Sequence, residues 1–386
     1  MNSKMRSKFS IYIHWPYCLS KCPYCDFNSH ISKEKIDQNK YTTLIKKELD
    51  YYSDIMSKKS VLSVFFGGGT PSLMEPSVIY NILNHIAKRF NFENPIEITL
   101  EANPTSVESD KFRHYSDFGI NRVSIGVQSL NDKALKNLGR NHTSKEAISA
   151  IETAHQYFKS ISLDLIYCRP GQKKKEWEKE LIQALALDTH HISLYQLTIE
   201  PDTMYEKLFR SGKLILPDEE LSRELYLITE LLCKNYSLFK YEISNFSKRG
   251  HESVHNLNYW NSGEWIGVGP GSHSRIESQD NQRISIVNEY DPQKWEYYMR
   301  KSGFSYIEKQ ELTQEHIRDE YILMSMRTSK GMDINKYINL GGYLDKEKIE
   351  SLTIDGYIRM DKNTNYLQIT SKGSIISDHI ISELAL

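Results

Sequence analysis

Residues 12–27 read YIHWPYCLSKCPYCDF, and they place Cys18, Cys22 and Cys25 in a CxxxCxxC spacing directly after a short strand-like run. The chain has five cysteines in 386 residues, so three within eight positions favour a metal site over a disulfide framework and indicate a reducing compartment. Soft thiolates suit a 4Fe-4S cluster. Because such a cluster has four irons, three cysteines leave one iron free to bind another ligand.

Zinc is the alternative metal for this motif, but a structural zinc site normally has four protein ligands. The local sequence supplies a fourth ligand only if His14 or His30 is recruited. The other two thiols are expected to be inert. Cys233 lies in an apolar helical run and is expected in the core, while Cys168 alternates with Asp164 on one face of a predicted strand.

Outward from the cysteines, strand-like and helix-like patterns alternate along the first two hundred residues. Helical patterns follow Pro76 and a capping box formed by Thr143 and Glu146. This alternation predicts a parallel α/β sheet that either curls or winds doubly, with ligands bound beyond the carboxyl ends of the strands. The strand segments, rich in β-branched and aromatic residues, are 11–14, 62–66, 96–101, 122–127, 161–167 and 192–197.

The alternation of strand-like and helix-like segments weakens after about residue 200, and a different pattern begins near residue 308. Helical patterns at 315–326 and 345–355 are followed by strand patterns at 357–360 and 366–369. Two helices and a hairpin predict a small winged-helix-like module. Winged helices often bind DNA, but this region lacks a dense basic face, so no nucleic-acid partner is expected.

The overall charge excludes strong long-range attraction of polyanions, since 49 Lys and Arg balance 50 Asp and Glu. The basic N-terminus has an apolar stretch too short for a signal peptide, and no uncharged run approaches the roughly 18 residues of a membrane span. A cytoplasmic protein is therefore expected. A peripheral membrane contact is compatible with this sequence.

The cysteine motif resembles that of the radical SAM superfamily, whose members bind S-adenosylmethionine (SAM) at the free iron of a 4Fe-4S cluster. The resemblance implies an incomplete (β/α)6 TIM-type barrel with reductive cleavage of SAM to a 5'-deoxyadenosyl radical. It divides the chain into a barrel core at 1–240, a barrel-completing segment at 241–305 and the winged-helix-like domain at 306–386. The expected SAM contacts are the loop residues Gly67, Gly68, Gly69 and Thr70 and the polar residues Glu101, Gln128, Arg140 and Asp164, with Tyr12 and Phe27 as apolar walls.

Elementary chemistry agrees with several of these roles. Glycines let a loop approach a ligand closely. A carboxylate such as Glu101 can accept hydrogen bonds from both ribose hydroxyls, and Arg140 can pair with a carboxylate. Taken singly, each residue could equally be a solvated strand-end polar group.

Within the superfamily, the chain resembles the group of oxygen-independent coproporphyrinogen III oxidases (HemN) and heme chaperones (HemW). The shared stretches are HISLYQL at 191–197, YEISNF at 241–246 and GVGPGSH at 267–273. One stretch departs from the group, because residues 164–172 read DLIYCRPGQ where most relatives have DLIYGLPGQ. This departure changes the loop beside the expected SAM pocket, while the cysteine motif is unaffected.

Three features favour the chaperones over the oxidases. Phe27 stands where the oxidases have a fourth cysteine, and only 17 residues precede Cys18 whereas the oxidases have a long N-terminal extension. Residues 255–260 read HNLNYW and match HNxxYW, a motif associated with heme binding, which makes His255 the expected axial ligand. The alternative is a His-Asn turn whose aromatic neighbours anchor a loop to the core.

The sequence therefore predicts a heme chaperone that carries a 4Fe-4S cluster and SAM and passes heme to an unidentified acceptor protein, with respiratory proteins as a candidate class. The alternative function is a radical SAM coproporphyrinogen III oxidase of porphyrin biosynthesis. Whether the chain is an enzyme stays open. A homodimer is compatible with the sequence.

Overall fold

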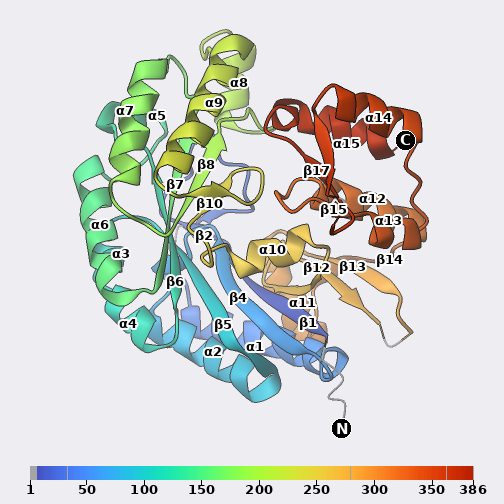
Figure 1. Cartoon of the computed structure of the whole chain (residues 1–386). Coiled ribbons are helices and arrows are strands. Elements are labelled where there is room, and N and C mark those ends of the chain that lie inside the picture. Colours follow the sequence, from blue (N-terminus) through green and yellow to red (C-terminus); the bar gives the residue numbers. More distant parts are fainter. Residues whose placement is uncertain (1–6, 33, 279, 362, 386) are drawn as a thin grey trace.

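Six adjacent parallel strands form the centre of the computed structural model, which describes residues 7–32, 34–278, 280–361 and 363–385 (Figure 1). They lie in chain order across the sheet. Together they contain five of the six predicted segments in full and the sixth, 192–197, up to residue 196. The strands are β1 (Lys8–Trp15), β4 (Ser60–Gly68), β5 (Asn91–Ala102), β6 (Arg122–Gln128), β7 (Ser160–Tyr167) and β8 (His191–Gln196).

Further strands extend the sheet at both edges. Next to β1 lies the parallel strand β11 (Glu264–Val268), and beyond it the antiparallel strands β12 (His273–Glu277), β13 (Arg283–Asn288) and β14 (Tyr306–Glu311). Next to β8 lie the antiparallel strands β10 (Asn245–Ser247) and β9 (Phe239–Lys240). Among the described residues no pairing joins β14 to β9, so the sheet is the incomplete barrel that was predicted.

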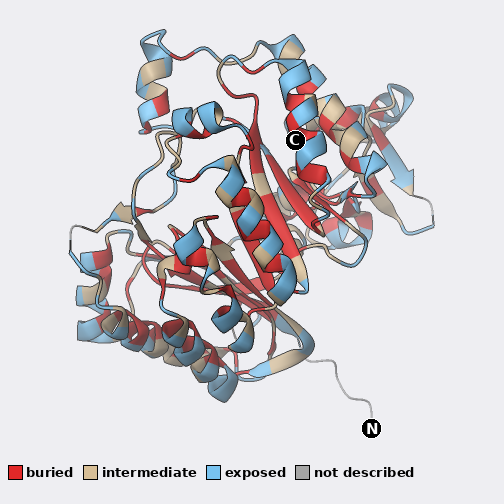
Figure 2. Cartoon of the chain, turned by 90° about the vertical axis from the view of Figure 1, so that its left-hand side faces the viewer, coloured by how far each residue is buried: buried red, intermediate tan, exposed pale blue. Residues whose placement is uncertain are grey.

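Helices cover the outer face of this sheet, and their apolar sides are buried against it (Figure 2). Helix α2 (Pro76–Arg89) buries Ile79, Ile82 and Ile86, each worth roughly 1.5–3 kcal/mol. Helix α6 (Ser144–Tyr157) begins at the predicted capping box. The remaining helices up to residue 302 are α1 (Gln38–Ile55), α3 (Ser106–Ser109), α4 (Phe112–Asp117), α5 (Asp132–Asn137), α7 (Lys174–Leu185), α8 (Met204–Arg210), α9 (Glu219–Asn235), α10 (Val254–Trp260) and α11 (Pro292–Ser302).

The C-terminal module has a hydrophobic core of its own, which includes Ile322, Leu352, Leu367 and Ile380. The two predicted helices and the hairpin are present, and two further helices and a short strand complete the module. Its elements are α12 (Gln314–Ser325), β15 (Met332–Asp333), α13 (Ile334–Asn339), α14 (Lys346–Ile354), β16 (Ile358–Asp361), β17 (Tyr366–Ile369), the 3-10 turn η2 (Gly373–Ile376) and α15 (Ser377–Ala385).

A search of the described residues for membrane spans finds no helix whose length and apolar character would let it cross a bilayer.

Candidate functional site

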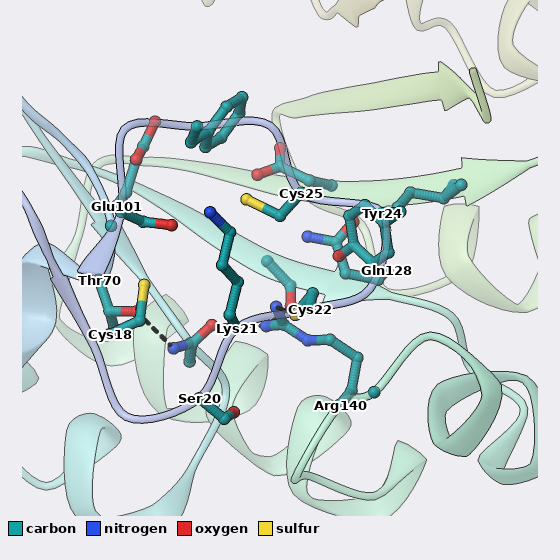
Figure 3. A pocket seen from close by; sticks show the side chains of 18 of the residues that line it. Cys18, Ser20, Lys21, Cys22, Tyr24, Cys25, Thr70, Glu101, Gln128 and Arg140 are labelled. Atoms are coloured by element: carbon teal, nitrogen blue, oxygen red, sulfur yellow. Dashed lines mark hydrogen bonds between the residues drawn. The ribbon is translucent and has the colours of Figure 1, made fainter. Parts of the chain in front are cut away.

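A cavity of about 410 Å³ opens at the carboxyl ends of the parallel strands (Figure 3). The cysteine loop, the glycine loop after β4 and the ends of β5 to β8 surround it. The structure thus brings together most of the residues that the sequence selected from scattered positions. Those that line the cavity are Cys18, Cys22, Cys25, Phe27, Gly68, Gly69, Thr70, Glu101, Gln128, Arg140 and Asp164.

Two of the expected cofactor contacts, Tyr12 and Gly67, are not among the described residues that line this cavity. The Tyr12 ring stacks on Phe65 with centroids 6.2 Å apart, and its hydroxyl lies 3.1 Å from His14 Nδ1. A Cβ on Gly67 would lie 2.8 Å from Tyr12 Cε2. Both residues therefore pack the barrel beneath the cavity. Phe27, the other expected wall, lines the cavity with an exposed ring.

The cysteine loop is held at its far end by Asn28. The Asn28 side-chain amide donates to the carbonyl oxygens of Pro270 and Tyr290, each at 3.0 Å. His14 Nε2 lies 2.9 Å from the Asn28 carbonyl oxygen. The short strands β2 (Tyr17–Cys18) and β3 (His30–Ile31) pair in parallel within the loop. The GVGPGSH stretch, which the sequence left without a role, thus supports the cysteine loop.

All three thiols are partly exposed to the cavity. The Thr70 hydroxyl donates to Cys18 Sγ at 3.4 Å, and Arg140 Nη1 donates to Cys22 Sγ at 3.6 Å. Burial raises the pKa of the Cys18 and Cys25 thiols. These two thiols therefore need a stabilising cation, such as iron, to remain ionised at neutral pH.

The described residues contain no group of three His, Cys, Asp or Glu side chains that could hold one metal ion. The two histidines considered as a fourth zinc ligand are already engaged. His14 Nε2 contacts the Asn28 carbonyl oxygen, and His30 Nε2 lies 3.0 Å from Asn28 Oδ1. A cluster spans the space between separate thiols, so this three-thiol donor set fits 4Fe-4S better than a single zinc ion.

The glycine loop needs its glycines to approach the cysteine loop. Gly68 has φ +114°, and a Cβ there would lie 2.8 Å from the Trp15 carbonyl oxygen. A Cβ on Gly69 would lie 2.7 Å from the Tyr17 carbonyl oxygen. The Gly69 amide donates to the Trp15 carbonyl at 2.7 Å, which fixes the two loops together. Gly68 and Gly69 thus lie close to the backbone of the cysteine loop and also line the cavity.

Two carboxyl groups form an acidic part of the cavity. Burial, followed by the charge of Asp164, raises the pKa of Glu101 to about 8. Burial also raises the pKa of Asp164, which accepts a hydrogen bond from the Ser124 hydroxyl at 3.1 Å. The Gly68 amide donates to Glu101 Oε2 at 3.2 Å. These carboxyl groups have remaining acceptor capacity for ligand hydroxyls or a cationic group.

Arg140 is fixed by the protein itself. Its Nη2 donates to the Gly126 carbonyl at 3.0 Å and to the side-chain oxygen of Asn103, while Nη1 faces Cys22. Sequence reasoning missed Asn103, which lines the cavity two residues after Glu101. The available signal was the stretch LEANP at 100–104, since it continues past the end of the predicted strand 96–101 into a turn.

The unusual CRPGQ stretch supports the turn that carries Gln128, a residue with φ +63°. Arg169 Nη1 donates to Glu180 Oε1 at 3.1 Å, and both side chains are buried. The same Glu180 oxygen accepts from the Leu130 amide at 2.8 Å, two residues beyond Gln128. Arg169 therefore neutralises a buried carboxylate that holds the end of β6.

Cys168 is 2% exposed, lies outside the cavity lining and has φ +57°.

His255 lies near the opposite end of the sheet from the cysteines, on α10, and is 1% exposed. Its Nδ1 lies 2.9 Å from the Ser63 hydroxyl and its Nε2 lies 2.8 Å from the Tyr259 hydroxyl. Burial lowers the pKa of His255 to about 3, so the imidazole is neutral. With both ring nitrogens engaged, His255 does not fit an axial heme ligand in this arrangement. The observed contacts are those of the alternative role, an anchor to the core.

Comparison with known proteins agrees with the fold. The model of the Radical SAM superfamily matches residues 12–182. A heme chaperone HemW of Buchnera aphidicola is 41% identical over 72% of this chain and 73% of its own length. The heme chaperone HemW of Escherichia coli is 32% identical over 96% of this chain and 97% of its own length.

Among solved structures, the coproporphyrinogen III oxidase HemN of Escherichia coli, described as a radical SAM enzyme, has a TM-score of 0.82. It is 19% identical and covers 98% of this chain and 90% of its own. At that identity the similarity establishes the shared fold.

Proposed function

This chain belongs to the radical SAM superfamily and to its HemN/HemW group, and on that premise we propose that it is a heme chaperone carrying a 4Fe-4S cluster and SAM. In this proposal it binds heme and transfers it to an acceptor protein. The observation that carries the cofactor half is the convergence of three thiols and two carboxyl groups on one cavity. The heme half is supported by the names of the relatives.

The bound cofactors would supply one-electron reductive chemistry at a carbon–sulfur bond. Cys18, Cys22 and Cys25 would hold the cluster, and Arg140 and Thr70 would donate hydrogen bonds toward it or toward SAM. Glu101 and Asp164 would accept hydrogen bonds from the ligand. Phe27, at 60% exposure, occupies the position of the fourth cysteine of the oxidases and offers the cavity an apolar edge.

Heme titration of the cluster-loaded protein tests the chaperone proposal. Anaerobically reconstituted protein should bind hemin stoichiometrically, with a shifted Soret band. It should then transfer the heme to an apo-hemoprotein, which is separated from it afterwards by an affinity tag and assayed for heme. Protein that takes up no heme, or never yields it to an acceptor, would refute the proposal.

A parallel incubation with coproporphyrinogen III, SAM and a reductant distinguishes the oxidase. The chaperone proposal expects no decarboxylated product above the level of a reaction without protein. Catalytic turnover to protoporphyrinogen IX would make the chain an enzyme. Phe27 is the feature of the described cavity that favours the chaperone.

The remaining assignments follow from the same proposal. We propose a cytoplasmic protein whose acceptor is a hemoprotein, with respiratory proteins as the first class to test. We also propose peripheral membrane contact, which vesicle flotation tests, and a homodimer, which light scattering tests. Ligation by His255 stays a prediction, and the structure adds the condition that α10 must first release the imidazole from Ser63 and Tyr259.

A further inference from the structure

A second cavity, of about 640 Å³, lies between the barrel edge and the C-terminal module. Helix α9 and the residues of β9 and β10 line one side, and the segments after α12 and β17 line the other. It shares no lining residue with the cysteine cavity. Neither the cysteine motif nor the HNxxYW motif contributes to it. We call it the interdomain cleft.

The barrel side of the interdomain cleft exposes large apolar side chains. Leu231 on α9 is 57% exposed, Leu227 one turn earlier is 43% exposed, and Phe239 on β9 is 41% exposed. Ile243 is also exposed at the same cleft. Contiguous exposed apolar side chains in a concave site mark a surface that a ligand or partner covers. The cleft therefore offers a wall to an apolar body.

The same cleft is cationic, although the chain as a whole has a net charge of -1. Its lining contains four basic side chains and one carboxylate, Glu230. Glu230 is paired with Lys240 at 3.0 Å, and Arg327 is paired with Asp378 at 2.8 Å, which leaves a net positive cleft. The basic side chains are Lys234, Lys240, Arg327 and Arg359.

The polar edge of the cleft is basic. Arg327 Nε is buried there without a hydrogen-bond partner among the described residues, whereas the nearby hydroxyls of Thr370 and Ser374 already donate to the backbone carbonyls of Gly356 and Ser371. A ligand with an apolar face and carboxylate groups at one edge matches this lining. Apolar contact would cover Leu231 and Phe239, and the carboxylates would meet the basic side chains.

The cysteine cavity has the opposite balance of charged residue types. Its lining holds two basic residues, Lys21 and Arg140, against five acidic residues, of which Glu101, with its pKa raised to about 8, ionises only above neutral pH. That balance suits the sulfonium of SAM and disfavours a dicarboxylate. The acidic residues are Asp26, Glu101, Glu108, Asp164 and Glu200.

We propose that the interdomain cleft binds the porphyrin, an apolar macrocycle with two propionate carboxylates. This location rests on the proposed heme-binding function and deepens it. It requires no movement of α10, because the cleft is open while His255 remains bonded to Ser63 and Tyr259. It also separates the porphyrin from the cysteines, so that the two cofactor sites can be loaded independently.

The experiment titrates the full cluster-loaded chain with metal-free protoporphyrin IX and follows its fluorescence. Two variants test the two halves of the cleft: Leu231→Glu places a charge on the apolar wall, and Lys234→Glu with Arg359→Glu inverts the basic edge. All three positions are exposed, so the changes should leave the fold intact. Matched controls outside the cleft are Ile354→Glu, at a residue 78% exposed, and Arg113→Glu, at a side chain 71% exposed.

We expect each cleft variant to weaken porphyrin binding by roughly tenfold or more, and the controls to bind as the wild type does. Protoporphyrin IX dimethyl ester, which lacks the carboxylates, should bind the wild type and the Lys234→Glu/Arg359→Glu variant equally. Wild-type binding that both cleft variants retain would overturn the proposed location and leave the heme-chaperone proposal standing. A wild type that binds neither porphyrin nor hemin would overturn both.

Discussion

The two ends of the parallel sheet differ in the burial and hydrogen bonding of their titratable side chains. At the amino end, His191 and His255 have all four ring nitrogens in hydrogen bonds, to Ser162, Tyr241, Ser63 and Tyr259. At the carboxyl end, the three thiols are partly exposed, and Cys18 and Cys22 accept hydrogen bonds from Thr70 and Arg140, respectively. Buried polar groups whose hydrogen bonds are all made within the protein stabilise the fold. Groups that keep free hydrogen-bonding or metal-coordinating capacity can bind a ligand. Burial and bonding thus distinguish two motifs that look equally functional in the sequence.

Replacing a cluster cysteine gives the largest expected effect and tests the carboxyl end. Cys22→Ala should abolish incorporation of iron and sulfide after reconstitution, because two thiols cannot retain the cluster. The melting temperature of the cluster-free protein should change little, since Cys22 is partly exposed. Iron analysis and absorption spectra measure the loss. Cys168→Ala is the matched control, and a Cys22→Ala protein with full iron content would contradict the site.

Replacing His255 tests the amino end through stability. His255→Ala should lower the free energy of unfolding by about 2–4 kcal/mol, because it opens a cavity and leaves the hydroxyls of Ser63 and Tyr259 without their partner. Urea denaturation of the cluster-free protein measures it. An exposed histidine, His114, supplies the control His114→Ala. Wild-type stability in His255→Ala would mean that α10 is not anchored as described.

A change of the acidic part of the cavity should affect ligand binding more than folding. Glu101→Gln should weaken SAM binding by about tenfold, or 1.4 kcal/mol, at alkaline pH. Because the pKa of Glu101 is raised to about 8, the carboxylate that accepts hydrogen bonds forms as the pH rises through that value. Wild-type affinity should therefore rise over this range more than that of Glu101→Gln. Calorimetry of the cluster-loaded protein measures both, and parallel pH profiles would remove Glu101 from the site.

The acid sensitivity of the fold gives a finer test of the amino end. The folded-state pKa of His255 is lowered to about 3, so the unfolded chain binds its proton first as the pH falls. This histidine's contribution is complete above the unfolded pKa of about 6.5 and is lost toward pH 3, at up to about 1.4 kcal/mol per pH unit. His255→Gln should make the pH dependence of stability shallower in that window, as measured by urea titrations. If the free energy of unfolding of His255→Gln depends on pH as steeply as that of the wild type, a group other than His255 binds the proton.

The smallest effect concerns Cys168, whose φ of +57° is unfavourable for a residue with a Cβ. Cys168→Gly should change the free energy of unfolding by less than about 1 kcal/mol, because the strain that glycine relieves is offset by the loss of a buried side chain. Thermal unfolding measures the net change. Iron content and SAM affinity should stay unchanged, since Cys168 does not line the cavity. A loss of SAM affinity in Cys168→Gly would give this thiol a role at the carboxyl end.

The sequence predicted what is encoded locally. Each parallel strand carries its own β-branched pattern, and the cysteine spacing needs only a few neighbouring residues, so both were readable before any fold was known. The engagement of His255 was not readable, because Ser63 lies 192 residues away. The support of Leu130 by Glu180 was hidden for the same reason. The interdomain cleft could not be predicted either, since segments from 227 to 377 meet there.

The contacts of Asn28 with Pro270 and Tyr290 have a consequence for the order of biosynthesis. A ribosome exposes the three cysteines early, but the backbone that braces their loop is translated more than 240 residues later. Strand β1 likewise receives its neighbour β11 only near residue 264. We therefore expect the nascent chain to hold its cysteines in an unfinished loop until most of translation is complete, and cluster assembly to follow release of the polypeptide rather than accompany its elongation.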